Sequence, residues 1–128
     1  NGIYGMTGGQ MAPTTLPGMK ATTCQSGRDV KVNGNPIHVS EMLATLDGPA
    51  FIERVSVDSA PNVIKAKKAI KKALECQMKG LGFSMVEVVS SCPTNWGMTA
   101  VKAMEFVREK MIPFYPLGVY KDITEEAK

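Results

Sequence analysis

The sequence predicts an α/β fold, on the basis of two candidate strands and the helical patterns beside them. The stretches "AFIERVSV" (residues 50–57) and "FSMVEVVS" (83–90) are rich in β-branched and aromatic residues, as strands are. A helical pattern lies between them, and a second one follows the later stretch. Because strand, helix, strand and helix alternate with short links, we expect a βαβ unit whose two strands are parallel.

A short helix is predicted over residues 37–46 and a strand over 50–57. Apolar residues recur at helical spacing in "IHVSEMLATL", and Asp47-Gly48 ends that pattern. In 50–57 successive residues alternate between two faces, as in a strand. The second strand, 83–90, is almost continuously apolar, which is typical of a buried position in a parallel sheet.

The clearest helix is predicted over residues 58–80. Asp58 or Ser59 can cap its N-terminus, and Gly80 can end it. Its lysines lie away from the apolar stripe that is expected in the core. They lack the interleaved aromatic side chains of a nucleic-acid site, so a solvated face is favoured. The stripe consists of Val63, Ala66, Ile70, Ala73 and Leu74, and the lysines are Lys65, Lys68, Lys71 and Lys72.

The two ends of the chain carry less regular patterns. A last helix is predicted over 99–111, and the tail, 112–128, is broken by prolines and ends in charged residues. The N-terminal segment, 1–36, contains most of the turn-forming residues. A loop of this length in a compact domain is usually functional or disordered, and its apolar members favour an ordered, packed loop.

The composition is that of an ordinary globular domain, with 44% hydrophobic and 21% charged residues in 128. A net charge of +3 is too small to imply a nucleic-acid partner, and no apolar run reaches the roughly 20 residues of a membrane helix. The three cysteines, Cys24, Cys76 and Cys92, form no disulfide pattern and favour a reducing cytoplasm. Because the chain begins at Asn1 inside a glycine-rich motif, we expect it to be a piece of a longer protein.

The opening segment "NGIYGMTGGQ" has two interpretations. The string "MTGGQ" also occurs in a common epitope tag, so the segment could come from a vector. Alternatively, it is a functional loop. The amide oxygen of Asn1, the hydroxyl of Thr7 and the accessible backbone at the glycines suit a Mg²⁺ ion that bridges to a phosphate.

Cys92 directly follows the second strand, in "SSCPTNWG". The C-terminal ends of parallel strands are where α/β proteins place ligands and catalytic groups, and a packed free thiol is the alternative. Cys76 lies in the long helix and is expected in the core. His38 is the only histidine, so a structural or surface role is favoured over a Ser-His-Asp triad or a zinc site.

Three separated motifs resemble the β subunits of 2-oxoacid:ferredoxin oxidoreductases. The stretch "NGIYGMTGGQMAPTT" resembles their thiamine-diphosphate loop, and "GFSMVEVVSSCPTNWGM" and "YPLGVYKD" resemble their later signatures in the same order. A tag would not account for "CPTNWGM" far along the chain. The resemblance implies that 1–128 is the C-terminal portion of a thiamine-diphosphate-binding domain, with a mostly parallel sheet flanked by helices. It divides this portion into a cofactor loop (1–36), an α/β unit (37–111) and a tail (112–128).

The resemblance also implies a set of site residues. Mg²⁺ would be bound by the Asn1 side chain, the Ile3 backbone carbonyl and an aspartate from an upstream "GDG" segment, which this sequence lacks. Cys92 matches the fourth cysteine ligand of a 4Fe-4S cluster whose other three ligands lie N-terminal in the family. Cys24 is not assigned to the cluster, and no acid–base residue is implied on this chain. The implied cofactor-binding residues are Asn1, Ile3, Tyr4, Met6, Thr7, Gly8, Gly9 and Gln10.

The implied activity is the oxidative decarboxylation of a 2-oxoacid to an acyl-coenzyme A, with electrons passed to ferredoxin. It would belong to a cytoplasmic complex with an α subunit and further subunits, in anaerobic metabolism, with no nucleic-acid or membrane partner. The stretches "ATLDGPAFIERVSV" and "CPTNWGM" favour the 2-oxoglutarate and branched-chain (2-oxoisovalerate) members. We expect the isolated chain to be inactive and to bind thiamine diphosphate poorly.

Two alternatives stay open at this point. The chain could be a non-catalytic interaction or regulatory domain that reuses the same fold without its cofactor. It could also be a small basic nucleic-acid binder, which would bind with a steep dependence on salt concentration.

Overall fold

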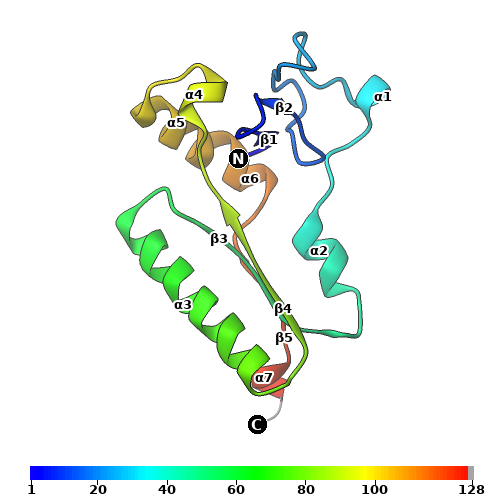
Figure 1. The fold of residues 1–128 in the computed structure, drawn as a ribbon, viewed down its shortest axis with the longest axis vertical. Helices are drawn as coiled ribbons and strands as arrows, with labels where there is room; N and C mark the ends of the chain where they lie inside the picture. The colour runs from blue at the N-terminus through cyan, green and yellow to red at the C-terminus, as the bar shows by residue number, and fades with distance from the viewer. Residues whose placement is uncertain (127–128) are drawn as a thin grey trace. The chain divides into compact units, whose positions relative to one another are not determined.

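A computed structural model describes residues 1–126, and the chain forms two compact units. The first unit contains residues 1–38 and 90–114, and the second contains 39–89 and the chain from 115 onward. The elements of the first unit are β1 (Ile3–Tyr4), β2 (Gln10–Met11), α1 (Val30–Asn33), α4 (Pro93–Trp96), α5 (Ala100–Phe106), a π-helical turn (Val107–Met111) and α6 (Ile112–Phe114). Those of the second are α2 (Val39–Ala44), β3 (Pro49–Ser56), α3 (Ala60–Met78), β4 (Phe83–Val89), β5 (Gly118–Asp122) and α7 (Ile123–Glu126) (Figure 1).

The sheet of the second unit is mixed. β3 lies in the middle, with β4 parallel on one side and β5 antiparallel on the other. The prediction of two parallel strands joined by a helix is therefore confirmed. The expectation of a mostly parallel sheet is corrected, because the segment expected to be an irregular tail supplies β5. Pro116 precedes that strand without interrupting its pairing with β3.

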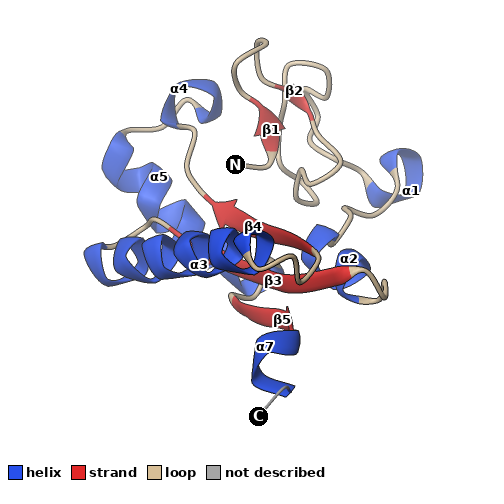
Figure 2. Ribbon diagram, turned by 60° about the horizontal axis from the view of Figure 1, so that its bottom comes forward, coloured by secondary structure: helices blue, strands red, loops and turns tan. Residues whose placement is uncertain are grey.

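Helix α3 packs against β3 and β4, as Figure 2 shows. Cys76 is buried in this core, as predicted. The predicted stripe is wrong at Ile70 and Leu74, whose side chains are 45% and 58% exposed. Small side chains face the sheet instead and allow the helix to approach it closely. The buried core cluster consists of Phe51, Val55, Ala66, Ala69 and Cys76.

The two ends of α3 lie close to the predicted positions. Ser59 occupies the N-cap position, but its side chain makes no capping hydrogen bond. Asp58 instead accepts hydrogen bonds from the Ser56 hydroxyl and, at 2.8 Å, from the Asn62 amide. After Met78 the chain leaves the helix through Gly80, which has a positive φ of 66° and thus a conformation that favours glycine.

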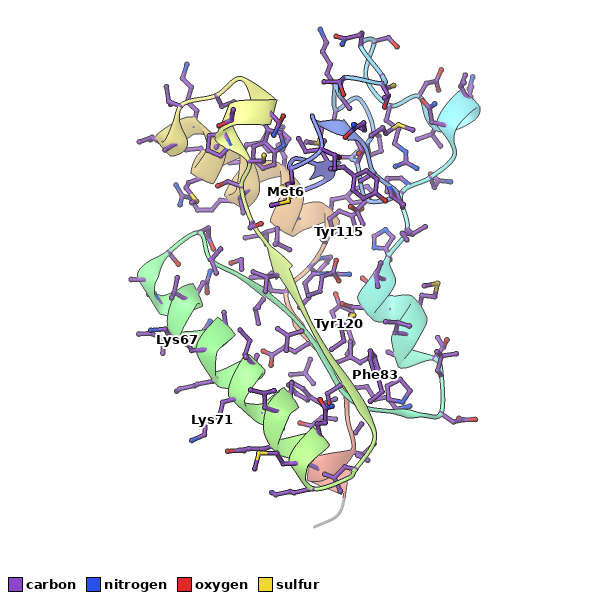
Figure 3. All side chains as sticks on the ribbon, in the orientation of Figure 1. Met6, Lys67, Lys71, Phe83, Tyr115 and Tyr120 are labelled. Carbon is purple, nitrogen blue, oxygen red and sulfur yellow. The ribbon has the colours of Figure 1, made fainter. Side chains whose placement is uncertain are left out.

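The lysines of α3 largely form the predicted solvated face. Figure 3 shows Lys67 and Lys71 pointing away from the helix. Lys71 lies 3.8 Å from Glu75 in an exposed pair of little energetic weight. Lys72 differs from the others, because it forms an ion pair with Asp122 of β5 and so ties the helix to the sheet edge.

Strand β4 is not the buried strand that the sequence predicts. Phe83 is 55% exposed and Val88 is 37% exposed, whereas Val89 is buried. Within the described residues β4 pairs with β3 only, so it forms an edge of the sheet. Its apolar composition therefore leaves an apolar surface along this edge.

The face of β3 opposite the core carries a buried arginine. Arg54 is fully buried, and its guanidinium donates to both carboxylate oxygens of Glu41 in α2, at 2.9 and 2.5 Å. It also donates to Glu87 of β4 at 2.9 Å and to the Tyr120 hydroxyl of β5 at 2.7 Å. Burial alone would lower the pKa of Arg54, but the hydrogen bonds and charges of the two carboxylates raise it overall. Arg54 therefore stays charged and joins α2 to all three strands.

Glu53, the neighbour of Arg54 on β3, is expected to make the stability of the protein depend on pH. Burial raises the pKa of Glu53 above its ordinary 4.5, Lys72 opposes this shift and Asp122 adds to it. A raised carboxyl pKa means that stability is greatest while the group is protonated and falls as the pH rises from 4.5 through the raised value. We expect Glu53→Gln to raise the thermal unfolding midpoint near pH 7 and to change it little near pH 4. Thermal unfolding followed by circular dichroism at both pH values measures this, with the exposed Glu105→Gln as the control. An equal shift at both pH values would contradict the argument.

The first unit is largely irregular before residue 38, as predicted, and helical after residue 92. The predicted helix over 99–111 is confirmed at α5 and continues through the π-helical turn to Phe114. The side chain of Thr99 caps α5 by accepting a hydrogen bond from the Lys102 backbone at 3.4 Å. The division of the chain into a cofactor loop (1–36), an α/β unit (37–111) and a tail (112–128) stays a prediction.

Candidate functional site

The opening segment of the chain is a closed hairpin. β1 and β2 pair in antiparallel register, with Ile3 opposite Met11 and Tyr4 opposite Gln10. The Gly9 N–H donates to the Tyr4 carbonyl at 2.9 Å across the turn. Gly8 and Gly9 have φ values of 116° and 80°, which other residues adopt only with strain. The consecutive glycines are therefore needed to turn the backbone here.

Polar side chains at the tip of this hairpin brace each other. The Thr7 hydroxyl donates to the Gln10 side-chain oxygen at 2.6 Å, and the Gln10 amide donates to the Thr7 carbonyl at 2.7 Å. Two largely apolar side chains point outward: Met6 is fully exposed and Tyr4 is about half exposed. An ordered turn that presents apolar side chains to the outside is suited to contact another molecule.

The base of the hairpin carries the two oxygen donors expected for Mg²⁺. The Asn1 side-chain oxygen accepts a hydrogen bond from the Ile3 N–H at 3.2 Å, so both residues lie together. Thr15 is fully buried, accepts from the Ala12 N–H at 2.8 Å and donates to the Gly2 carbonyl at 2.5 Å. Thr15 thus holds the backbone between Asn1 and Ile3 in place.

Arg28 holds the rest of the N-terminal loop. Its side chain is buried, with 6% of the residue exposed, and its guanidinium donates only to backbone carbonyls among the hydrogen bonds found in residues 1–126. These bonds span 2.9–3.4 Å and join residues 12–15 to residues 33–35, at the end of α1. The acceptors are Ala12, Pro13, Thr15, Asn33, Gly34 and Asn35.

Cys92 lies directly against the hairpin, although the two are far apart in the sequence. A Cβ atom placed on Gly5 would lie only 2.9 Å from the Cys92 sulfur, closer than real Cβ contacts. A Cβ atom on Gly9 would lie 2.9 Å from the Asn95 side-chain oxygen. Asn95 also donates a hydrogen bond to the Gly5 carbonyl at 2.9 Å. Glycines at both positions therefore allow the segment that starts at Cys92 to close onto the loop.

The ligand atoms that this chain offers fit part of the implied Mg²⁺ site and part of the implied 4Fe-4S site. Amide and carbonyl oxygens are ligands that Mg²⁺ prefers, but within residues 1–126 no three His, Cys, Asp or Glu side chains gather as a metal site would require. Cys92 is a half-buried free thiol and fits one ligand position of an iron–sulfur cluster. Cys24 lies 3.8 Å from Asn33 instead, and Cys76 belongs to the other unit.

Two residues near the site were missed by the sequence patterns: Arg28 and Asn95. Each acts through contacts with residues distant in the sequence, which no local pattern reveals. Thr15 is one of the loop hydroxyls that the sequence places beyond Thr7, and its hydrogen bonds to the backbone of Gly2 and Ala12 were not predicted. His38 packs against Phe114 with ring centroids 5.2 Å apart, in keeping with a structural role.

A pocket of about 350 Å³ lies beside Asn95 in the first unit. Met19, Trp96 and Phe106 give it a largely apolar lining, to which Lys20 also contributes. The rings of Trp96 and Phe106 contact each other at 5.1 Å, which gives one wall a fixed shape.

Comparisons with known proteins agree with the motifs. The chain is 47% identical over all of its 128 residues to the ketoisovalerate oxidoreductase subunit VorA of Methanothermobacter marburgensis. It is 34% identical over 131 aligned positions, 98% of the chain, to the 2-oxoglutarate synthase subunit KorB of Methanocaldococcus jannaschii. It is also 35% identical over 94 residues, 73% of the chain, to the 2-oxoacid:ferredoxin oxidoreductase subunit beta of Saccharolobus solfataricus.

The chain spans only part of each of these relatives. It covers 27% of the ketoisovalerate subunit, 43% of the 2-oxoglutarate synthase subunit and 27% of the Saccharolobus subunit. Neither a family model nor a solved structure matches it. Within residues 1–126, no helix has the length and apolar character needed to cross a membrane.

Proposed function

Since this chain belongs to the family of 2-oxoacid oxidoreductase subunits of the 2-oxoglutarate and 2-oxoisovalerate type, we propose that it forms the C-terminal part of a thiamine-diphosphate-binding β subunit. In this proposal the subunit takes part in the oxidative decarboxylation of a 2-oxoacid to an acyl-coenzyme A, with electrons passed to ferredoxin. The chain acts within a complete enzyme, because its own donors supply only part of each site.

The close approach of Gly5 to Cys92 is the observation that carries this proposal. It brings the loop expected to hold the cofactor next to the thiol expected to hold the cluster. Bound thiamine diphosphate would supply the carbon nucleophile for decarboxylation, and a 4Fe-4S cluster would accept electrons one at a time. Adjacent binding of the two groups gives the short path that such electron transfer needs.

The chain's own residues would bind and orient these groups. The Asn1 side-chain oxygen and the Ile3 carbonyl would be ligands of Mg²⁺, with further ligands from outside this chain. Gly8 and Gly9 would let the backbone approach the diphosphate closely, and the Thr7–Gln10 pair would keep the turn rigid. Tyr4 and Met6 would contact the reaction side of the cofactor.

Exposed apolar surfaces support a role within a larger assembly. Phe83 and Val88 on the edge strand β4 and Ile70, Leu74 and Met78 on α3 all have exposed side chains. Apolar surface of this extent on a domain commonly marks a contact with other chain segments or subunits. Partner subunits are part of the proposal on these grounds, whereas ferredoxin and coenzyme A are part of it because of the family.

We further propose that the substrate is a branched-chain 2-oxoacid rather than 2-oxoglutarate. The ketoisovalerate relative is 47% identical, against 34% for the 2-oxoglutarate relative, each over nearly the whole chain. The exposed Met6 at the hairpin tip offers an apolar contact, which suits an aliphatic side chain better than a second carboxylate.

Gly9→Ala in the complete enzyme tests the cofactor assignment. The added methyl group combines a strained φ of 80° with a 2.9 Å contact to Asn95, and so displaces the turn. We expect at least about a tenfold weaker binding of thiamine diphosphate in the presence of Mg²⁺, which is about 1.4 kcal/mol. Isothermal titration calorimetry measures it.

Gly80→Ala is the matched control for that experiment. Gly80 also has a positive φ, 66°, but a Cβ atom there would meet open space, and Gly80 belongs to the other unit. The control should therefore have backbone strain like that of Gly9→Ala but keep the original affinity for thiamine diphosphate. Unchanged affinity in Gly9→Ala, or an equal loss in both variants, would refute the assignment of this turn to the cofactor.

A further inference from the structure

We propose that Asn95 is a positioning residue that links the cofactor loop to the cluster ligand Cys92 and raises the reduction potential of the cluster. This inference rests on the proposed function, in which Cys92 binds iron. It concerns a residue that the sequence motifs did not single out.

The Asn95 side-chain amide contacts both partners through one nitrogen. Its Nδ2 atom lies 2.9 Å from the Gly5 carbonyl oxygen and 3.3 Å from the Cys92 sulfur. A primary amide nitrogen carries two hydrogens, so it can donate one to each acceptor. The hydrogen bond to Gly5 thereby orients the second N–H toward the sulfur.

Local backbone structure places Asn95 at this position. Cys92 is the N-cap residue of α4, and the Trp96 N–H donates to the Cys92 carbonyl at 3.0 Å. Residues three apart on a helix are neighbours, so the side chain of Asn95 lies beside that of Cys92. Gly97, with a φ of 63°, ends the turn directly afterwards. The short helix thus gives the asparagine a defined orientation toward the sulfur.

On the loop side, the space around Gly5 and Gly9 also restricts the position of the Asn95 side chain. A Cβ atom on Gly5 would lie 3.3 Å from the Asn95 nitrogen as well as 2.9 Å from the sulfur. The Asn95 side-chain oxygen faces Gly9. The exposed asparagine therefore contacts two glycines of the loop, and its position depends on that of the loop.

A hydrogen bond to a ligand sulfur changes the redox properties of an iron–sulfur cluster. Reduction adds negative charge that spreads onto the sulfur atoms, and an N–H donor stabilises this charge. The reduced form is favoured, so the reduction potential rises. Because the same amide is held by Gly5, displacement of the cofactor loop would weaken the hydrogen bond and lower the potential.

Two variants of the complete enzyme test the inference, with cluster potentials measured by redox titration monitored by electron paramagnetic resonance. Asn95→Leu has a similar size without a donor, and Asn95→Asp has the same shape with acceptors only. We expect both to keep their iron and to shift the cluster potential to more negative values. Asn35→Asp is the matched control, because Asn35 is exposed and contacts Arg28 only through its backbone carbonyl. Its cluster potential should be unchanged.

A second measurement detects the hydrogen bond itself rather than its effect on the potential. Pulsed electron paramagnetic resonance in D₂O should detect an exchangeable deuteron near the cluster that Asn95→Asp lacks. Unchanged potentials in both variants, or the same deuteron signal in Asn95→Asp, would overturn the inference. If Cys92→Ala keeps its full iron content, the proposed function fails first. If Cys92→Ala loses its cluster while the Asn95 variants keep the original potential, the inference alone fails.

Discussion

Replacement of Cys92 by alanine in the complete enzyme should remove the 4Fe-4S cluster, seen as loss of iron and of the broad visible absorbance. Cys92 is a free thiol that lies against Gly5 of the hairpin, and alanine offers no ligand atom in its place. Electron transfer to ferredoxin should be lost with the cluster. Iron analysis and the visible spectrum of the purified complex measure the effect without relying on activity.

Cys24→Ala is the matched control, because Cys24 is also partly exposed and belongs to the same unit. It should keep iron and spectrum unchanged, since its sulfur lies near Asn33 and no contact with the hairpin is found for it among the described residues. An unchanged iron content in Cys92→Ala would contradict the ligand assignment. It would also revive the alternative of a non-catalytic domain that shares the fold.

The second large effect is expected for Arg54→Met, with a loss of about 3 kcal/mol or more in the free energy of unfolding. Methionine fills much of the arginine's space but leaves Glu41 and Glu87 without the cation between them. Tyr120 and the Pro116 carbonyl lose the same donor, at 2.7 and 3.2 Å, so β5 loses part of its attachment. Chemical denaturation followed by circular dichroism measures the loss.

Two further variants separate loss of the cation from loss of packing. Lys67→Met removes an exposed charge from α3 and should change the free energy of unfolding by less than about 0.5 kcal/mol. The triple change Arg54→Met, Glu41→Gln and Glu87→Gln removes the uncompensated carboxylates and should recover part of the loss. A single Arg54→Met variant as stable as the unaltered protein would show that the ion pairs of Arg54 with Glu41 and Glu87 contribute no net stability.

The sequence predicted the elements whose signals are local. The long helix was recognised because its N-terminal proline, its closing Gly80 and its helical periodicity all lie within one segment. The five-residue strand β5 was missed, because "GVYKD" forms a strand only through pairing with β3 far away in the sequence. The exposure of Ile70 has the same origin: periodicity locates an apolar stripe but does not say which part of it meets the sheet.

At the candidate site, too, local features could be predicted from the sequence and long-range contacts could not. The glycines of the hairpin and the thiol of Cys92 were visible as motifs, because each has a short sequence context. Their contact was not visible, nor was Asn95 between them, since it depends on the folding of the first unit around Arg28.

The hydrogen bonds of Arg28 have a consequence for the kinetics of cofactor binding. They hold the backbone of the N-terminal loop with protein groups alone, so the conformational entropy of that loop is lost when the chain folds. A ligand that enters such a preorganised loop does not have to order it, and more of the contact energy remains as affinity. Association should then follow the rate of encounter rather than the rate of a slow loop closure.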